Sequence, residues 1–148
     1  MEFNVLLDDF AARHKVENLV VVDGAAALDI DGIIVTIVAK DEVLTFSAEI
    51  GAPPAEGAAT FADLLLEANM QSGSFFAKTP DPGIYILVRR LSLPSVDDNG
   101  FDSALEAFVN QAETWRRLLA DFRPIAKAAA ERTDAGSPSF GSTGFMQV

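Results

Sequence analysis

The sequence predicts an α+β protein in which an antiparallel, twisted sheet packs against helices in the order α-β-β-β-α-β-β-α. Apolar residues recur at steps of three and four in three segments, which is the spacing of an amphipathic helix. Runs of β-branched and aromatic residues lie between those segments, are separated by turn residues, and favour strands. A chain of 148 residues has the length of one domain and can bury roughly 68–70% of its unfolded surface, so it needs no disulfide for stability.

The first helix is predicted from roughly residue 3 to residue 15. Phe3, Leu6, Leu7 and Phe10 fall on one face of this helix. It is closed by basic residues, which the negative end of the helix dipole prefers: Arg13, His14 and Lys15.

Three strands are predicted next, at Ala25 to Ile30, Ile33 to Ala39 and Val43 to Ile50. Asp31-Gly32 joins the first two strands and predicts a type I′ hairpin turn, because both positions of that turn need positive φ. The short apolar run before them is broken by Asp23-Gly24, and the predicted order has no strand there.

The second of these strands is apolar on both sides. Ile33, Val35 and Ile37 point to one face of the sheet, and Ile34 and Val38 point to the other. Helices on one side cannot cover both sets, and leaving such side chains in water forgoes about 1.5–3 kcal/mol each. Two explanations stay open. Either the strand is central and buried on both faces within its own chain, or a partner covers its second face.

A second helix is predicted to begin at Thr60. Thr60 would cap it, and Asp63, three residues on, favours the positive end of the dipole. Two strands follow, Phe75-Phe76 and Ile84 to Val88, joined by the turn Pro80-Asp81-Pro82-Gly83.

The last helix is predicted to start at Asp97-Asp98-Asn99-Gly100, whose side chains suit a helix N-terminus, and to end or kink at Pro124. Its apolar residues alternate at steps of four and three and form a single seam: Phe101, Leu105, Phe108, Ala112, Trp115, Leu119 and Phe122.

The prediction divides the chain at the end of this helix. Residues 1–123 form the α+β domain, and residues 124–148 form a C-terminal extension, a short helix followed from Thr133 by a flexible tail rich in Gly, Ser and Thr. We expect the large apolar residues of the tail to occupy an apolar groove in the same or a neighbouring molecule: Phe140, Phe145 and Met146.

Charge and composition exclude several classes of partner. The net charge of −11 would repel phosphate backbones and anionic lipid, so we expect no nucleic acid and no membrane. The N-terminal region has Glu2, Asp8 and Asp9 where a signal peptide would carry basic residues. The chain has no cysteine, which is compatible with a reducing cytosol. We therefore expect a cytoplasmic protein. Because 49% of the residues are hydrophobic, some apolar surface is expected to meet a partner, unless a well-filled core accounts for it.

The sequence predicts no catalytic residues, no metal and no cofactor. His14 is the only histidine and is expected to be a cation at the end of a helix. Asp23, Asp29 and Asp31 lack the full pattern of a calcium loop. No nucleotide-binding or nucleophile motif is present, and Gly141-Ser142-Thr143-Gly144 lies in the tail with no base nearby. We expect the protein not to be an enzyme.

The order of elements, the acidic composition and three segments resemble a known family. The segments are Leu64-Leu65-Leu66-Glu67-Ala68-Asn69, then Gly73-Ser74-Phe75-Phe76, then the strand Ile84 to Val88 ahead of an aromatic final helix. Together, over roughly residues 3 to 123, they resemble the type III secretion chaperones of the Tir chaperone (CesT-like) family. The resemblance implies a small cytoplasmic homodimer that binds the N-terminal segment of a secreted effector protein in extended form and keeps it soluble for export, without ATP.

The resemblance also implies two sets of contact residues. The effector-binding residues would come from the first helix and the sheet: Leu7, Phe10, Ile34, Val38, Leu44 and Phe46. The dimer interface would come from the second helix and the strands after it: Leu64, Leu65, Phe75, Ile84 and Ile86. Two alternatives stay open, a regulatory or sensory domain of the same fold with no secreted cargo, and a small enzyme that uses carboxylates alone.

Overall fold

Six strands form one antiparallel sheet in the computed structural model, which describes residues 2–17, 19–71 and 73–123. Their order across the sheet is β1-β2-β3-β4-β6-β5. The predicted α+β class and antiparallel sheet are confirmed. The strands are β1 (Val21–Val22), β2 (Ala25–Ile30), β3 (Ile33–Lys40), β4 (Val43–Gly51), β5 (Ser74–Lys78) and β6 (Tyr85–Ser92). The helices are α1 (Phe3–His14), α2 (Ala58–Ala68) and α3 (Asp98–Ala120), with a short 3-10 helix, η1 (Leu93–Ser95), before α3.

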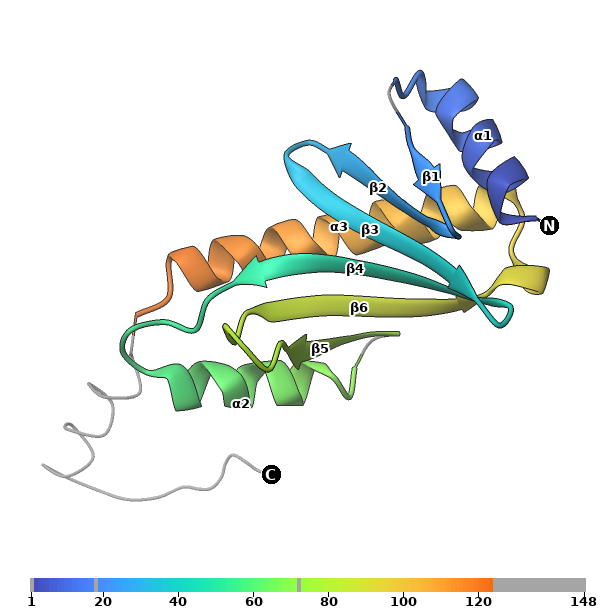
Figure 1. The fold of residues 1–148 in the computed structure, drawn as a ribbon. Coiled ribbons are helices and arrows are strands. Elements are labelled where there is room, and N and C mark those ends of the chain that lie inside the picture. Colours follow the sequence, from blue (N-terminus) through green and yellow to red (C-terminus); the bar gives the residue numbers. More distant parts are fainter. Residues whose placement is uncertain (1, 18, 72, 124–148) are drawn as a thin grey trace, which may run out of the picture.

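The helices pack on one face of this sheet. Figure 1 shows α3 running along the sheet, α1 near the start of α3 and α2 beside β5. Phe46 of β4 is fully buried, and its ring makes edge contacts with Phe101 at 5.7 Å and with Phe108 at 5.6 Å between centroids. Phe10 of α1 contacts Phe101 at 5.4 Å. The core therefore lies between the sheet and α3, with α1 closing one end.

Three hairpin turns carry consecutive residues with positive φ, one of them between β3 and β4, where Asp41 and Glu42 have φ of 52° and 63°. Asp31 and Gly32 have φ of 54° and 87°, which confirms the predicted turn between β2 and β3. Asp23 and Gly24 have φ of 51° and 74° and join β1 to β2 in the same way. The predicted order lacks this short first strand, because in the sequence the Asp-Gly pair marks only the end of an apolar run.

The predicted start of α2 is wrong. The helix begins at Ala58, its N-cap is Gly57 with φ of 78°, and no side chain caps it. Phe61 N donates to Gly57 O at 3.0 Å, so Thr60 already lies within the first turn. The alanines before Thr60 favour the helical state, and they extend the helix past the residue that the sequence marks as a cap.

The predicted start and seam of α3 are confirmed. Asp97 is the N-cap, and its side chain accepts a hydrogen bond of 2.7 Å from Gly100 N. Phe101, Leu105 and Phe108 are buried, and Trp115 packs against the core. The predicted helix and tail of 124–148 lie outside the described residues, and the boundary at residue 123 stays a prediction. In the described part of the chain, no helix combines the length and the hydropathy needed to cross a bilayer.

Candidate interaction surface

The candidate site is the face of the sheet that points away from α3. Side chains alternate along each strand, so Ile33, Val35 and Ile37 of β3 are buried while their neighbours are exposed. The strand registers extend this second face across the sheet, and we call its part on β3, β4, β6 and β5 the outer face. Its residues are Ile34, Thr36 and Val38 of β3, Val43, Thr45, Ser47 and Glu49 of β4, Ile86, Val88 and Arg90 of β6, and Phe75 and Ala77 of β5.

The outer face leaves large apolar side chains in water. Ile34 exposes 55% of its surface, Val38 36% and Val43 37%. The described residues therefore cover only one face of β3, and burial of this strand on both faces by the described part of its own chain is excluded. Burying these side chains against a partner would be favourable by up to about 1.5–3 kcal/mol each.

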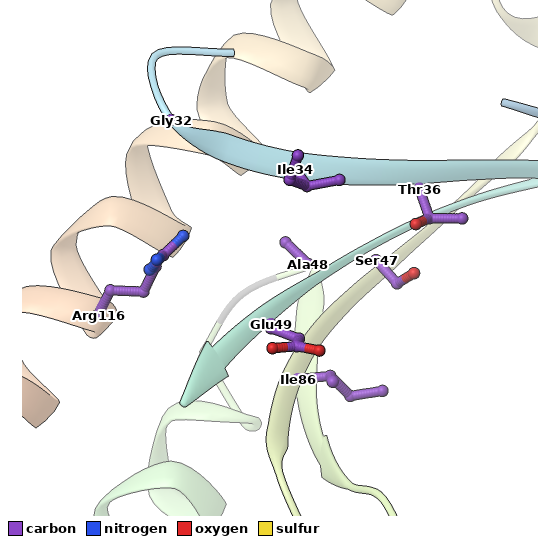
Figure 2. Close-up of a pocket in the computed structure, with 8 residues that line it drawn as sticks. All are labelled: Gly32, Ile34, Thr36, Ser47, Ala48, Glu49, Ile86 and Arg116. Atoms are coloured by element: carbon purple, nitrogen blue, oxygen red, sulfur yellow. The ribbon is translucent and has the colours of Figure 1, made fainter. Parts of the chain in front are cut away.

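A pocket opens in the outer face where β3 and β4 separate. Their register ends at Thr36 and Ser47, beyond which β3 pairs only with β2, and β4 only with β6. The cavity in this wedge has a volume of about 400 Å³, and we call it the wedge pocket (Figure 2). It is lined by Gly32, Ile34, Thr36, Ser47, Ala48, Glu49, Ile86 and Arg116.

The walls of the wedge pocket combine apolar groups with one charge of each sign. Ile34 comes from β3 and Ile86 from β6, on opposite sides of β4 (Figure 2). Arg116 points toward the pocket from α3, and Glu49 lines it from β4. Neither Glu49 nor Arg116 has an ion-pair partner among residues 2–17, 19–71 and 73–123. The pocket thus offers apolar contact, two hydroxyl groups and two unpaired charges to whatever enters it.

The part of the outer face near β5 is covered by its own side chains. Val88 is buried although no described helix lies over it. The guanidinium of Arg90 lies over the ring of Phe75, 5.3 Å from its centroid, in a cation–π geometry. The accessible apolar surface is therefore concentrated on β3 and β4.

The predicted effector-binding residues divide between the core and the outer face. Leu7, Leu44 and Phe46 are fully buried, and Phe10 is buried. These four lie in the hydrophobic core and offer no surface to a partner in this conformation. Ile34 and Val38 lie exposed on the outer face, so only these two of the six are available to a partner.

The predicted dimer residues lie around α2, β5 and β6. Leu64 is exposed, Phe75, Ile84 and Ile86 are half-buried, and Leu65 is buried against the core. The structure adds exposed apolar side chains that sequence reasoning did not select: Val43 on the outer face, and Leu66 and Met70 at 64% and 90% exposure on α2 and just after it. The Leu64-Leu65-Leu66 run was the available signal, because only one of three consecutive helical residues can face the core.

Charged groups cluster away from the outer face, between α1 and α3. Arg13 donates to Asp102 at 2.6 and 3.1 Å, and His14 Nε2 lies 3.0 Å from the same carboxylate. Desolvation raises the pKa of Asp102, but hydrogen bonds from Arg13 and His14 outweigh it and hold that pKa below its ordinary value. His14 thus lies at the end of a helix as expected, in contact with a carboxylate.

Within the described ranges, no three His, Cys, Asp or Glu residues are grouped so that they could hold a metal ion.

Comparison with known proteins identifies a family. The sequence profile of the Tir chaperone protein (CesT) family matches residues 5–116. No curated protein sequence matches the chain with significance.

Solved structures share the fold at low sequence identity. A chain of the ExsC–ExsE complex superposes with a TM-score of 0.68 at 22% identity, over 78% of this chain and 92% of that chain. A chain of the HopA1–SchA chaperone–effector complex gives 0.66 at 17% identity, over 78% and 93%. A chain of the Yersinia pestis type III secretion chaperone SycH in complex with a fragment of YscM2 gives 0.63 at 21% identity, over 77% and 99%. These similarities concern the architecture of the sheet and its helices.

Proposed function

The chain belongs to the Tir chaperone protein (CesT) family, and from this premise we propose that it is a type III secretion chaperone that binds an extended N-terminal segment of a secreted effector. It keeps that segment soluble and competent for export without ATP. The observation that carries the proposal is the uncovered outer face, where exposed Ile34, Val38 and Val43 lie beside the wedge pocket.

The outer face suits an extended peptide. Alternate side chains of an extended segment point the same way, so apolar residues at every second position would meet the exposed residues of β3 and β4. A larger apolar side chain would enter the wedge pocket between Ile34 and Ile86. The net charge of −11 would oppose non-specific aggregation of the chaperone and attract a basic effector segment.

We also propose a cytoplasmic homodimer that forms through α2 and the strands near it. Leu64, Leu66 and Met70 are exposed on or just after α2, and they add to the half-buried Phe75 and Ile86. An exposed apolar set of this kind favours association with a second protein surface.

Co-expression with the product of the adjacent open reading frame tests the proposed function. The product should co-purify with the full chain, and Ile34→Asp combined with Val38→Asp should weaken its binding by more than about 10-fold, because a carboxylate would be desolvated at the contact. Leu118→Asp is the matched control, since Leu118 is equally apolar and 49% exposed but lies on α3.

Two outcomes would count against this function. Unchanged binding in the outer-face variant would remove the outer face as the binding site. Failure of any co-encoded protein to bind would instead favour a regulatory or sensory domain of the same fold.

A further inference from the structure

The C-terminal segment of this chain has the composition of a tethered ligand. Residues 133–148 lie outside the described residues, and half of them are Gly, Ser or Thr. They carry one charged side chain, Asp134, and three large apolar side chains. Those side chains are Phe140, Phe145 and Met146. Isolated apolar residues in a polar segment are typical of anchors that fill pockets on another surface.

The chain leaves the described part close to the wedge pocket. The last described residues follow α3, where the ring of Phe122 packs on Phe61 at 5.1 Å between centroids. Figure 1 shows this end of α3 at the same end of the molecule as the β2–β3 turn and the end of β4, the two elements that border the pocket. Arg116 itself lines the pocket and precedes the end of α3 at Ala120 by about one turn of helix, or roughly 6 Å along an axis that rises 1.5 Å per residue.

The length of the segment is sufficient for it to reach the pocket. Phe140 follows Arg123 by 17 residues, which span at most roughly 56 Å when extended. A tether of this length would hold its anchor at an effective concentration on the order of millimolar. Even a weakly binding side chain of this segment would therefore occupy the wedge pocket for part of the time.

The wedge pocket fits an aromatic side chain. Its volume of about 400 Å³ exceeds that of a cavity of roughly 150 Å³ that holds benzene. Ile34 and Ile86 supply apolar walls on two sides. From residue 135 onward the segment carries no charged side chain, so the acidic character of the chain does not repel it.

We propose that residues 133–148 bind to the outer face of the same chain, with Phe140 or Phe145 in the wedge pocket. The segment shields the exposed residues of β3 and β4 until another ligand displaces it. If the proposed function holds, that ligand is the effector, and the segment weakens effector binding by competition.

Photo-crosslinking in the full chain tests the contact without any effector. A benzoylphenylalanine at position 140 or 145 should form adducts of single-chain mass that map to β3, β4 or β6. The same group at Ala129, which precedes the segment proposed to bind, is the control for random encounter and should crosslink at least 3-fold less to these strands. Ile34→Asp should reduce the adduct from positions 140 and 145 and leave that from position 129 unchanged.

A second measurement uses an apolar fluorescent dye. Phe140→Ser combined with Phe145→Ser should raise the fluorescence of bound dye at least 2-fold, whereas Ser137→Ala combined with Ser139→Ala should not change it. Adducts of two-chain mass, adducts that map elsewhere, or equal yields from all three positions would overturn the proposal. Because neither measurement involves an effector, failure here leaves the chaperone function untouched, and failure of effector binding leaves this contact untouched.

Discussion

Asn69 joins the end of α2 to β5 through both ends of its amide. Its Oδ1 accepts from Phe76 N at 2.6 Å and its Nδ2 donates to Phe76 O at 3.3 Å, in a partly buried setting. The Asn69 amide therefore supplies the hydrogen bonds that a further strand would make to Phe76 on the edge strand β5. The Ala-Asn ending of α2 thus has a structural role.

We predict that Asn69→Ala lowers the free energy of unfolding by about 1–3 kcal/mol, because the partly buried N–H and C=O of Phe76 lose their partners. Urea unfolding followed by circular dichroism measures this. Gln71→Ala, at an exposed position two residues away, is the control and should stay within about 0.5 kcal/mol of the parent. An equal effect of both substitutions would show that the amide contacts add no stability.

Asp102 should make part of the stability dependent on pH. Its carboxylate has a lowered pKa in the folded state, so its contribution is fully present above the ordinary value of 3.8 and is lost as the pH falls through the lowered pKa. Asp102→Asn should therefore reduce stability at pH 7, by less than about 1 kcal/mol because the pair is partly exposed to solvent. The difference from the parent should shrink toward zero in the acid range below pH 3.8. Thermal unfolding at pH 7 and at acid pH, with Asp8→Asn as an exposed control, measures this, and a difference that grows on acidification would contradict it.

At the scale of elements, the starts of α2 and α3 show when a capping side chain can be predicted from the sequence. Asp97 caps α3 through its side chain, whereas Thr60 lies inside α2 and caps nothing. We predict that Asp97→Ala costs about 0.5–2 kcal/mol and that Thr60→Ala changes stability by less than about 0.5 kcal/mol. Denaturant unfolding of the two variants side by side measures this. Equal losses would mean that the helix start at Ala58 is not the one formed in solution.

The local sequence pattern predicted where most helices and strands lie. It did not predict which part of the molecule each apolar face packs against. The alternation in β4 predicted a strand with one apolar side, but the sequence does not say whether Leu44 and Phe46 meet the protein's own helices or a partner. That choice depends on α3, which is more than 50 residues away and fills the space over both side chains. The outer face was predictable from Ile34 and Val38, whereas the wedge pocket depends on where the β3–β4 register ends, which no local pattern encodes.

At the scale of the whole molecule, the exposed face of α2 predicts the oligomeric state. Leu66→Asp should convert the proposed homodimer to a monomer, because it would desolvate a charge in the interface. Leu118→Asp, on the exposed side of α3, should leave the dimer intact. Light scattering after size exclusion at tens of micromolar measures both masses. A dimer that survives Leu66→Asp would place the interface elsewhere, and a monomeric parent protein would remove the dimer from the proposal.

The early end of the β3–β4 register divides the sheet into two ribbons that share only part of their length. Ile33 to Val35 pair with β2 alone, so a local opening of this end of the β2–β3 hairpin, which we call the flap, would leave the ladder between β4 and β6 intact. We expect backbone amides of this flap to exchange with deuterium faster than those of residues 36–39, where β3 has a neighbour on both sides. If the flap opens locally, the wedge pocket widens, so one pocket would accept cargo side chains of different sizes.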